Sequence, residues 1–401
     1  MPKINTDVEA FARIKIIGVG GAGKNATNYM IKSKVQGVEF IAVNTDAQDL
    51  HHSLAKKKIH IGKNLTNGLG AGMNPDLGKK AAEETMEEIQ DVLKGANMVF
   101  ITAGFGGGTG TGAAPVIAKA AKDLGILTVA VVTKPFMFEG AKRMSLAEQG
   151  LERLQNSVDA LIIIPNDRIL SVAPEGTTMD NAFAMSDKIL KEAVEGISDL
   201  ITIPGRINVD FADILAVMGD AGSALMGIGK ASGENRAEEA ARAAINSPLL
   251  DISIAGAKGV LLSVSGGDDL TINEIQEAAR IVTESIDPDA KVIFGTSKTD
   301  KVKKNEIKIT VIATGFKDGN KNLVGGTSLF QRSPKKEEIK EEKIGIFGTK
   351  KLAEKEEEEV KEEKKETPKK PEVKSKILDD NDDDDDTWDT IPSFLRRSKL
   401  K

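Results

Sequence analysis

The stretch that decides the fold is Ala103-Gly-Phe-Gly-Gly-Gly-Thr-Gly-Thr-Gly112. It follows the apolar run Asn97–Thr102, which is typical of a buried strand. It precedes Ala113–Asp123, which is typical of a helix with Pro115 in its first turn. The glycines leave backbone N–H groups unobstructed by any Cβ, and at a helix N-terminus such donors form a cradle for an anion. A flexible linker does not lie between a buried strand and a helix, so we predict a loop that binds a di- or triphosphate.

The composition limits the architecture and the partners of the chain. Its 401 residues suffice for two or three domains, and 40% hydrophobic residues are enough to build cores. The net charge of −6 argues against a nucleic-acid partner, and the absence of cysteine excludes disulfides and fits a reducing cytoplasm. No stretch approaches the ~20 apolar residues that span a bilayer, and the N-terminus lacks the apolar segment of a signal peptide. We therefore expect a cytoplasmic protein without direct membrane insertion.

A second glycine-rich turn follows a strand near the N-terminus and leads into a predicted helix over about residues 26–34. The segment Gly18-Val-Gly-Gly-Ala-Gly-Lys-Asn25 fits the dinucleotide fingerprint G-x-G-x-x-G, and it also fits the start of a Walker A loop. A Walker A loop needs Ser or Thr after its lysine to hold Mg²⁺, but position 25 is Asn. The dinucleotide interpretation does better, because the next strand, Val38–Asp46, ends in an acid that can bind a ribose. It gives no role, however, to the glycine loop after Ala103, whereas two phosphate loops suit one nucleotide held between them.

Resemblance to a known family decides between these interpretations. Gly106-Gly-Gly-Thr-Gly-Thr-Gly112 closely resembles the phosphate-binding loop of the tubulin superfamily, and with its surroundings the chain resembles the FtsZ family of bacterial cell-division GTPases. Three further segments match loops of that family: Gly20–Ala26, Asn44–Gln48 and Gly68–Pro75. Met73 departs from the pattern, since a smaller residue is expected there.

The resemblance implies a nucleotide site for GTP and GDP, with Mg²⁺ held mainly through the phosphates rather than by a metal site of the protein. The residues that it assigns to the nucleotide are Gly20, Gly21, Ala22, Gly23, Lys24, Asn25, Asn44, Asp46, Ala71, Gly72, Gly104, Gly106, Gly107, Gly108, Thr109, Gly110, Glu139, Arg143, Asn166, Phe183 and Asp187.

Some of these assignments have simpler alternatives when the residues are taken alone. Glu139 and Arg143 lie four apart on a helix predicted from residue 136 to about 156, so they can simply pair with each other. Asp187 can be a solvated helix carboxylate. The argument for guanine is that a carboxylate accepts hydrogen bonds from both N1–H and N2–H₂, a donor pair that adenine lacks on that edge. The resemblance assigns Glu139 to the ribose, Arg143 to the nucleotide and Asp187 to the base.

The segment Asn208-Val-Asp-Phe-Ala-Asp213 carries the catalytic hypothesis. By pattern alone, Asp210 is a helix N-cap and Asp213 its partner three residues on. The segment also closely matches a loop that, in the FtsZ family, lies far from its own nucleotide and meets the γ-phosphate of the next subunit. The resemblance therefore implies that Asn208, Asp210 and Asp213 are catalytic across a contact between two copies of the chain.

The predicted architecture is α/β. A Rossmann-like parallel-sheet GTPase domain over 13–178 follows a polar extension over 1–12 and leads into a long central helix over 179–203. An apolar stripe from Phe183 to Ile201 predicts that this helix is buried, and Thr177 and Asp180 are expected to form its N-terminal capping pair. A smaller α+β domain over 204–317 includes the catalytic loop. Its strands are predicted near 223–229, 259–265, 291–294 and 306–314, and its helices over 235–245 and 272–286.

Residues 318–386 are expected to form a disordered linker, because their Glu- and Lys-rich composition cannot bury a core. Residues 387–401 are expected to be a peptide that docks on a partner. They resemble the FtsZ C-terminal peptide, which implies that membrane-tethering and regulatory division proteins bind its anchors. These anchors are Ile391, Pro392, Phe394, Leu395 and Arg396. The alternative is a frayed terminus.

The sequence thus predicts a cytoplasmic GTPase that assembles head-to-tail and builds the division ring at mid-cell. A tubulin-like filament that moves plasmids would share the loops but need not carry the terminal peptide. A dinucleotide oxidoreductase would bind NAD and leave the loop of Asn208–Asp213 without a role. The three histidines, His51, His52 and His60, are expected to mark a surface stretch rather than a metal site.

Overall fold

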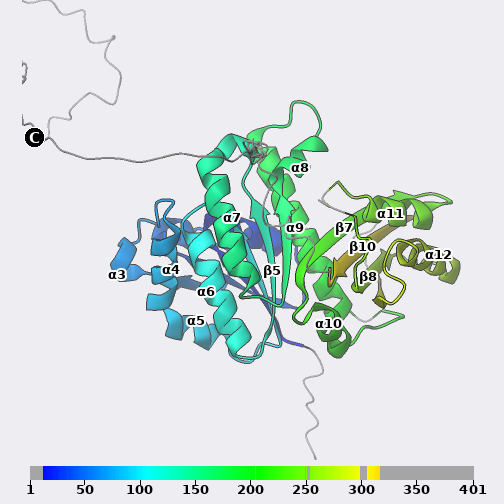
Figure 1. Cartoon of the computed structure of the whole chain (residues 1–401), viewed down its shortest axis with the longest axis horizontal. Helices are drawn as coiled ribbons and strands as arrows, with labels where there is room; N and C mark the ends of the chain where they lie inside the picture. The colour runs from blue at the N-terminus through cyan, green and yellow to red at the C-terminus, as the bar shows by residue number, and fades with distance from the viewer. Residues whose placement is uncertain (1–11, 204, 249, 251–252, 299–304, 317–401) are drawn as a thin grey trace, which may run out of the picture. The chain divides into compact units, whose positions relative to one another are not determined.

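The computed structural model describes residues 12–203, 205–248, 250, 253–298 and 305–316 (Figure 1). The predicted linker and terminal peptide lie outside these residues. The described part confirms an α/β architecture built on a mostly parallel sheet.

The first six strands pair in parallel, and all but the edge strand Lys57–His60 are largely apolar on both faces, as expected for a sheet covered by helices on two sides. In β1 (Ile14–Val19), Ile14 and Ile16 pack on one face while Ile17 and Val19 pack on the other. The strand order β3-β2-β1-β4-β5-β6 is that of a doubly wound dinucleotide fold. The remaining five strands are β2 (Val38–Asn44), β3 (Lys57–His60), β4 (Met98–Gly104), β5 (Leu127–Lys134) and β6 (Ala160–Pro165).

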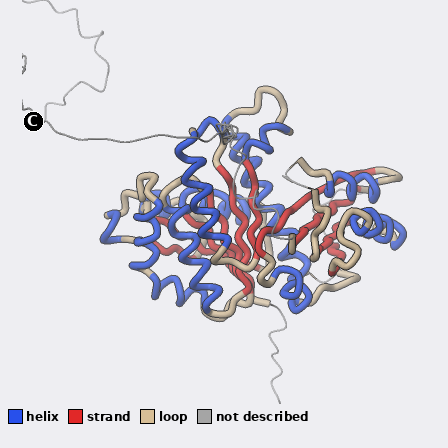
Figure 2. The backbone as a smooth tube through the Cα atoms, viewed as in Figure 1, coloured by secondary structure: helices blue, strands red, loops and turns tan. Residues whose placement is uncertain are grey.

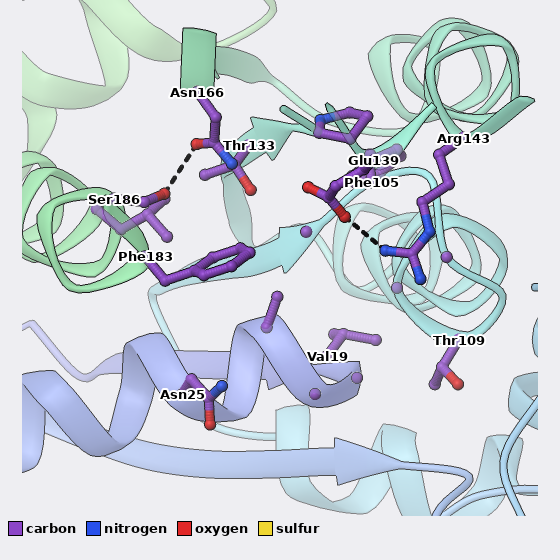
Figure 3. Close-up of a pocket in the computed structure, with 18 of the residues that line it drawn as sticks. Val19, Asn25, Phe105, Thr109, Thr133, Glu139, Arg143, Asn166, Phe183 and Ser186 are labelled. Atoms are coloured by element: carbon purple, nitrogen blue, oxygen red, sulfur yellow. Dashed lines mark hydrogen bonds and ion pairs between the residues drawn. The ribbon is translucent and has the colours of Figure 1, made fainter. Parts of the chain in front are cut away.

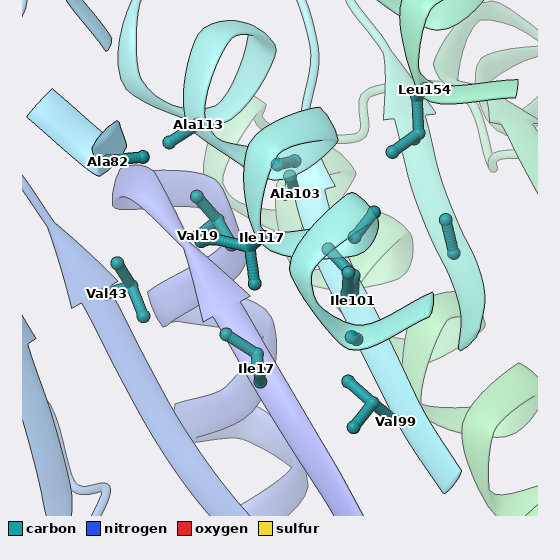
Figure 4. Close-up of a cluster of buried hydrophobic side chains, with 14 of the residues drawn as sticks. Ile17, Val19, Val43, Ala82, Val99, Ile101, Ala103, Ala113, Ile117 and Leu154 are labelled. Carbon is teal, nitrogen blue, oxygen red and sulfur yellow. The ribbon is translucent and has the colours of Figure 1, made fainter. Parts of the chain in front are cut away.

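Helices cover both faces of this sheet (Figure 2). One face packs under α4 (Pro75–Glu84), α5 (Met86–Leu93), α6 (Thr109–Asp123) and α7 (Ala141–Gln155), where Ile117 and Leu154 join the strand side chains in one buried cluster (Figure 4). The other face packs against α1 (Gly20–Lys32), α9 (Met179–Thr202) and α10 (Phe211–Met218). Short helices complete this half: α2 (Ala47–His51), α3 (Lys63–Thr66) and α8 (Asn166–Ser171).

Helix α9 is the long element between the two halves of the described structure. Its 24 residues give a length of about 36 Å, and Leu190, Val194 and Ile197 on its apolar stripe are buried. The N-cap is Thr178, whose side chain accepts from Asn181 N–H, so the predicted capping pair was placed one residue too early.

The second half is a smaller mixed sheet that continues the first. Its strand β7 (Gly222–Ser232) pairs in parallel with β6 over three residues and is followed in the sheet by β10 (Glu306–Thr314), β8 (Gly259–Gly266) and β9 (Lys291–Lys298). Helices α11 (Arg236–Ile245) and α12 (Ile272–Thr283) cover the outer face, where they enclose a third buried cluster.

Three predicted helix starts were wrong. Helix α1 begins at Gly20 instead of residue 26, and α6 begins at Thr109, so Pro115 lies inside the helix and not in its first turn. A glycine in α6 serves close packing instead of a turn, because a Cβ at Gly112 would stand 1.9 Å from the carbonyl oxygen of Pro75 in α4. The helix predicted from residue 136 is a 3₁₀ turn, η1 (Met137–Glu139), separated from α7 by Gly140 at a φ of 98°.

Candidate nucleotide-binding site

A cavity on the parallel sheet opens where β1 and β4 lie side by side. The chain leaves β1 for α1 on one face and leaves β4 for α6 on the other. Such a switch point opens a crevice at the carboxyl ends of the strands, which is where doubly wound sheets bind ligands. A cavity of about 400 Å³ lies there, within the range of small-molecule sites (Figure 3).

Two helix N-termini form the base of this cavity. Gly20, Gly21 and Ala22 open α1, and Gly107 to Gly110 lead into α6. The two segments touch, since a Cβ at Gly20, which has a φ of 72°, would stand 3.1 Å from Gly110 N. The unpaired N–H groups and the positive dipole ends of both helices therefore converge on one point, an arrangement that binds phosphate.

A charged pair lines the side of the cavity above α6. Arg143 Nη1 donates to Glu139 Oε2 at 2.5 Å, so these two residues form the ion pair that their four-residue spacing allows (Figure 3). Glu139 Oε1 also accepts from Phe136 N–H. Because both charged residues line the cavity as well, pairing with each other does not remove them from a bound ligand.

The opposite wall is built by α8 and α9. Asn166, at the carboxyl end of β6, accepts from Ser186 Oγ at 2.9 Å, while Phe183 lines the cavity at 38% exposure (Figure 3). Asp187 follows one turn after Phe183 and is partly buried. Burial raises the pKa of its carboxyl from 3.8 to about 7. A charged carboxylate there gains from a ligand with two N–H donors, because such donors replace the water that burial removes.

The predicted catalytic loop lies elsewhere. Asn208 Oδ1 accepts from Gly205 N–H just beyond the C-terminal end of α9, and Asp210 caps α10 by accepting from Asp213 N–H at 2.9 Å. Asn208, Asp210 and Asp213 are all exposed. Asp187 and Thr202 lie fifteen residues apart on α9, about 22 Å along the helix axis. The three loop residues follow the far end of α9 and do not line the cavity of their own chain.

Comparison with known proteins agrees with this geometry. Residues 13–174 match the GTPase domain of the Tubulin/FtsZ family, and residues 222–317 match the C-terminal domain of the FtsZ family. An FtsZ dimer from M. jannaschii is 46% identical with a TM-score of 0.74, over 77% of this chain and 89% of that chain. The chain belongs to the FtsZ family. It is thus a GTPase that binds GTP and GDP, which removes the dinucleotide oxidoreductase as an alternative.

The fold is also shared with a structure of lower sequence identity. CetZ2 from Haloferax volcanii, solved as a GTPγS-bound protofilament, is 23% identical over 76% of this chain and 94% of that chain, with a TM-score of 0.66. At this identity the likeness shows a shared fold alone.

Two thirds of the residues that the FtsZ resemblance assigned to the nucleotide line the cavity. They are Gly20, Gly21, Ala22, Asn25, Gly104, Gly107, Gly108, Thr109, Gly110, Glu139, Arg143, Asn166, Phe183 and Asp187. The others, which do not line it, are Gly23, Lys24, Asn44, Asp46, Ala71, Gly72 and Gly106.

The residues outside the lining have identifiable contacts. Lys24 and Asn44 both bind the carboxylate of Asp49, and Asp46 caps α2. Gly106 N–H donates to Thr111 Oγ1. Lys24 and Gly106 lie next to lining residues of the two glycine loops, whereas Asn44, Asp46 and Asp49 lie behind the first of these loops.

Two further assigned residues, Ala71 and Gly72, lie in the loop at 68–75, where Ala71 packs close to Gly108. The residue after them, Met73, has a φ of 58°, the left-handed region that side chains of its size rarely adopt. This conformation is the physical reason why a smaller residue is expected at that position.

Six lining residues were not predicted: Val19, Phe105, Thr133, Pro135, Ser186 and Leu190. A signal for four of them was present. Thr133 and Pro135 end a predicted strand at the ligand edge of the sheet, and Ser186 and Leu190 share the helix face of Phe183 at three- and seven-residue spacing.

Among the described residues, no group of three His, Cys, Asp or Glu side chains could hold a metal ion. His51 and His52 are exposed and pack edge-to-face, and His60 is partly buried. No helix in the described part of the chain is long and apolar enough to cross a membrane.

Proposed function

We propose that this FtsZ-family GTPase assembles head-to-tail into filaments that build the division ring. GTP held in the cavity of one copy is hydrolysed when the loop of Asn208–Asp213 from the next copy completes the site. The observation that carries the proposal is the length of α9 between Asp187 and that loop. A chain that has both parts of a hydrolytic site, but at separate ends, needs a second copy to join them.

The chemistry divides between the two parts. The N–H donors of the glycine loops stabilise charge on the phosphates, and Asp210 and Asp213 orient and polarise the attacking water. Mg²⁺ would be held mainly by phosphate oxygens against Gly107–Thr109, because the described residues offer it no carboxylate cluster. The ion neutralises phosphate charge when it is bound.

The geometry of such a contact favours a filament. A contact between two different surfaces repeats without limit unless its rotation closes a ring, so it gives an open polymer. The M. jannaschii FtsZ, which is 46% identical, was solved as a dimer. This relative supports association between copies as the first step.

The decisive experiment measures GTPase rate per subunit against protein concentration, with ATP and NAD as competitors. We expect the rate per subunit to rise cooperatively and to be inhibited by neither competitor. A dilute monomer that turns over GTP at the full rate would contradict the proposal. An equimolar mixture of Asp213→Ala with unmodified protein sharpens the test, because unmodified loops facing variant cavities restore part of the lost turnover.

We also propose that the segment 387–401 tethers the filament, at the mid-cell division site, to membrane-tethering and regulatory division proteins. The proposal rests on the sequence resemblance at Ile391–Arg396, outside the described residues. Deleting 388–401 should abolish binding to a tether while GTPase activity and filaments persist. Loss of polymerisation in the truncated protein would contradict it. A plasmid-moving filament remains the alternative, and localisation of the full chain in dividing cells distinguishes the two.

A further inference from the structure

Asp49, on α2, binds two of the residues that the FtsZ resemblance assigned to the nucleotide. Lys24 Nζ donates to Asp49 Oδ1 at 2.5 Å, and Asn44 Nδ2 donates to Asp49 Oδ2 at 2.7 Å. The Lys24 side chain is 9% exposed and that of Asp49 is 30% exposed. Asp49 itself does not line the cavity.

This ion pair lies directly behind the first phosphate loop. Asp49 Oδ2 is 3.6 Å from the position that a Cβ on Gly21 would occupy, and Gly21 lines the cavity. Lys24 does not line the cavity, whereas its neighbour Asn25 does. The ammonium group therefore lies on the side of α1 that faces α2, where it binds Asp49 and not the cavity.

Asp49 is itself held in place by its own helix. Its N–H donates to Asp46 Oδ1 at 2.9 Å, which is the N-cap contact of α2. The carboxylate thus extends from a capped turn, and its two oxygens are shared between one cation and one amide. This fixation explains how Asp46, assigned to the nucleotide but not part of the cavity lining, contributes to the site from behind.

The contacts continue from Asp49 to the second phosphate loop. Asn44 Oδ1 accepts from Thr45 N–H at 2.8 Å. Thr45 Oγ1 and Thr109 Oγ1 are 2.6 Å apart, and Thr109 lines the cavity at the start of α6. One chain of polar contacts therefore joins the helix of the first loop to the second loop.

We propose that Asp49 is a positioning residue for the triphosphate, setting the spacing between the two phosphate loops through Lys24 and Asn44. The inference rests on the proposed nucleotide site. Anion cradles act through donors held to within a fraction of an ångström, so supporting contacts govern their affinity. Removing the carboxylate leaves the buried ammonium of Lys24 without its counter-charge and Asn44 without an acceptor, and both loops lose a fixed support.

The test compares Asp49→Ala and Asp49→Asn with unmodified protein in equilibrium binding of GTP, ATP and inorganic tripolyphosphate. For Asp49→Ala we expect affinity for GTP and for tripolyphosphate to fall together by about tenfold. The GTP-over-ATP preference should not change, because the base contacts are intact. Asp49→Asn keeps an acceptor but loses the charge, so its loss should be smaller. Lys24→Met combined with Asp49→Ala should lose no more affinity than Asp49→Ala alone, since both act through one contact.

Two controls separate this role from general damage. Glu88→Ala removes the carboxylate of an exposed pair with Lys63, 3.2 Å apart, and should leave all three affinities unchanged. Asp187→Ala should reduce the GTP-over-ATP preference but leave tripolyphosphate binding intact. A thermal unfolding scan shows whether Asp49→Ala folds. If it does not fold, the binding measurements on Asp49→Asn alone decide the question.

Three results would overturn the inference while the nucleotide site stands. One is unchanged tripolyphosphate binding in both Asp49 variants. Another is tighter binding, which would mean that a released Lys24 reaches the phosphates directly. The third is a loss of base preference equal to the loss of phosphate affinity. If unmodified protein binds neither GTP nor tripolyphosphate, the proposed site itself fails and the inference fails with it.

Discussion

The two ends of α9 present carboxylates in opposite settings. At the cavity end, Asp187 is partly buried beside Phe183, and burial raises the pKa of its carboxyl to about 7. At the far end, Asp210 and Asp213 are exposed and belong to the capped first turn of α10. One end collects N–H donors and accommodates negative charge poorly until a ligand provides hydrogen bonds. The other end displays negative charge on the surface, where it is free to meet another molecule.

Under the proposed function, this difference explains why hydrolysis needs two copies of the chain. In that proposal the cavity holds the triphosphate through N–H donors but offers no carboxylate to polarise water, because Glu139 pairs with Arg143 and Asp187 is assigned to the base. The exposed aspartates can polarise water but have no phosphate beside them. Under the proposed function, hydrolysis is therefore a property of the contact between copies and not of the chain.

The largest effect is expected at the far end. Asp213→Ala should lower GTP turnover by about a hundredfold or more, the range for loss of a group that positions or activates water, while GTP affinity changes by less than about twofold. Steady-state turnover at saturating GTP and binding to the dilute monomer are the two measurements. If affinity falls as much as turnover, the loop is part of its own cavity and the comparison is wrong.

The next effect is expected at the cavity end. Asp187→Ala removes an acceptor of charged hydrogen bonds, each about 1.5–3 kcal/mol, so GTP affinity should fall by at least about tenfold. Adenine nucleotides should bind about as before, and the preference for GTP over ATP is the quantity to measure. An unchanged preference would show that another residue selects the base.

Much of the cavity end could be predicted from sequence, because its elements obey local rules. The parallel strands are apolar runs, and their glycine loops follow directly at the ligand edge. The starts of α1 and α6 could not be predicted. Glycine normally ends or weakens a helix, but at Gly112 it permits the close approach of α4, a tertiary contact with no local signal. Asp49 was missed for a related reason: Lys24 is 25 residues away along the chain, and only the fold brings its ammonium group to the carboxylate that also binds nearby Asn44.

At the far end, local spacing predicted the N-cap role of Asp210, whereas only the family resemblance predicted the distance of the loop from its own nucleotide. The N-cap role of Asp210 follows from local spacing, and the structure contains that hydrogen bond. Its distance from the cavity depends on the full length of α9 and on how that helix packs across the sheet. The apolar periodicity of α9 predicts its length, but how the helix packs across the sheet could be seen only in the structure.

A smaller effect concerns pH. Guanine donors favour the ionised carboxyl of Asp187, and below its pKa of about 7 the ligand-free protein must release a proton to bind. GTP affinity should therefore fall as pH is lowered, by about tenfold between pH 8 and pH 6. The γ-phosphate of GTP also titrates near this range, so Asp187→Asn is the control. The pH dependence should be weaker in that variant, and equal slopes in both proteins would contradict the assignment.

The smallest effect is on stability, and its sign should differ between the two ends. The folded pKa of Asp187 lies above its ordinary value of 3.8, so ligand-free stability that is present below about pH 4 is lost as pH rises through 7. Asp187→Asn removes that loss and should raise the melting temperature of ligand-free protein at pH 8, with a smaller gain at pH 5. A buried carboxylate of this kind lowers the free energy of unfolding of the protein without ligand, and a bound ligand that donates hydrogen bonds to it restores that stability.

At the far end the same kind of change should destabilise. Asp210→Ala removes the acceptor that caps α10 and should cost about 1 kcal/mol, a fall of about 2 °C in melting temperature for a unit of this size. Thermal scans of ligand-free Asp187→Asn and Asp210→Ala beside the unmodified protein, at pH 8, check both signs together. If both variants have a lower melting temperature, the carboxylate of Asp187 stabilises the fold, and it is not a destabilising buried charge kept to bind a base. If both melt later, the hydrogen bond at Asp210 contributes nothing to α10, and the exposed aspartates are retained for function alone. A rise in melting temperature for Asp187→Asn together with a fall for Asp210→Ala is the only result that agrees with the comparison. It would mean that Asp187 is kept for a ligand at the expense of stability, while Asp210 stabilises α10 as a cap and stays exposed to a second copy.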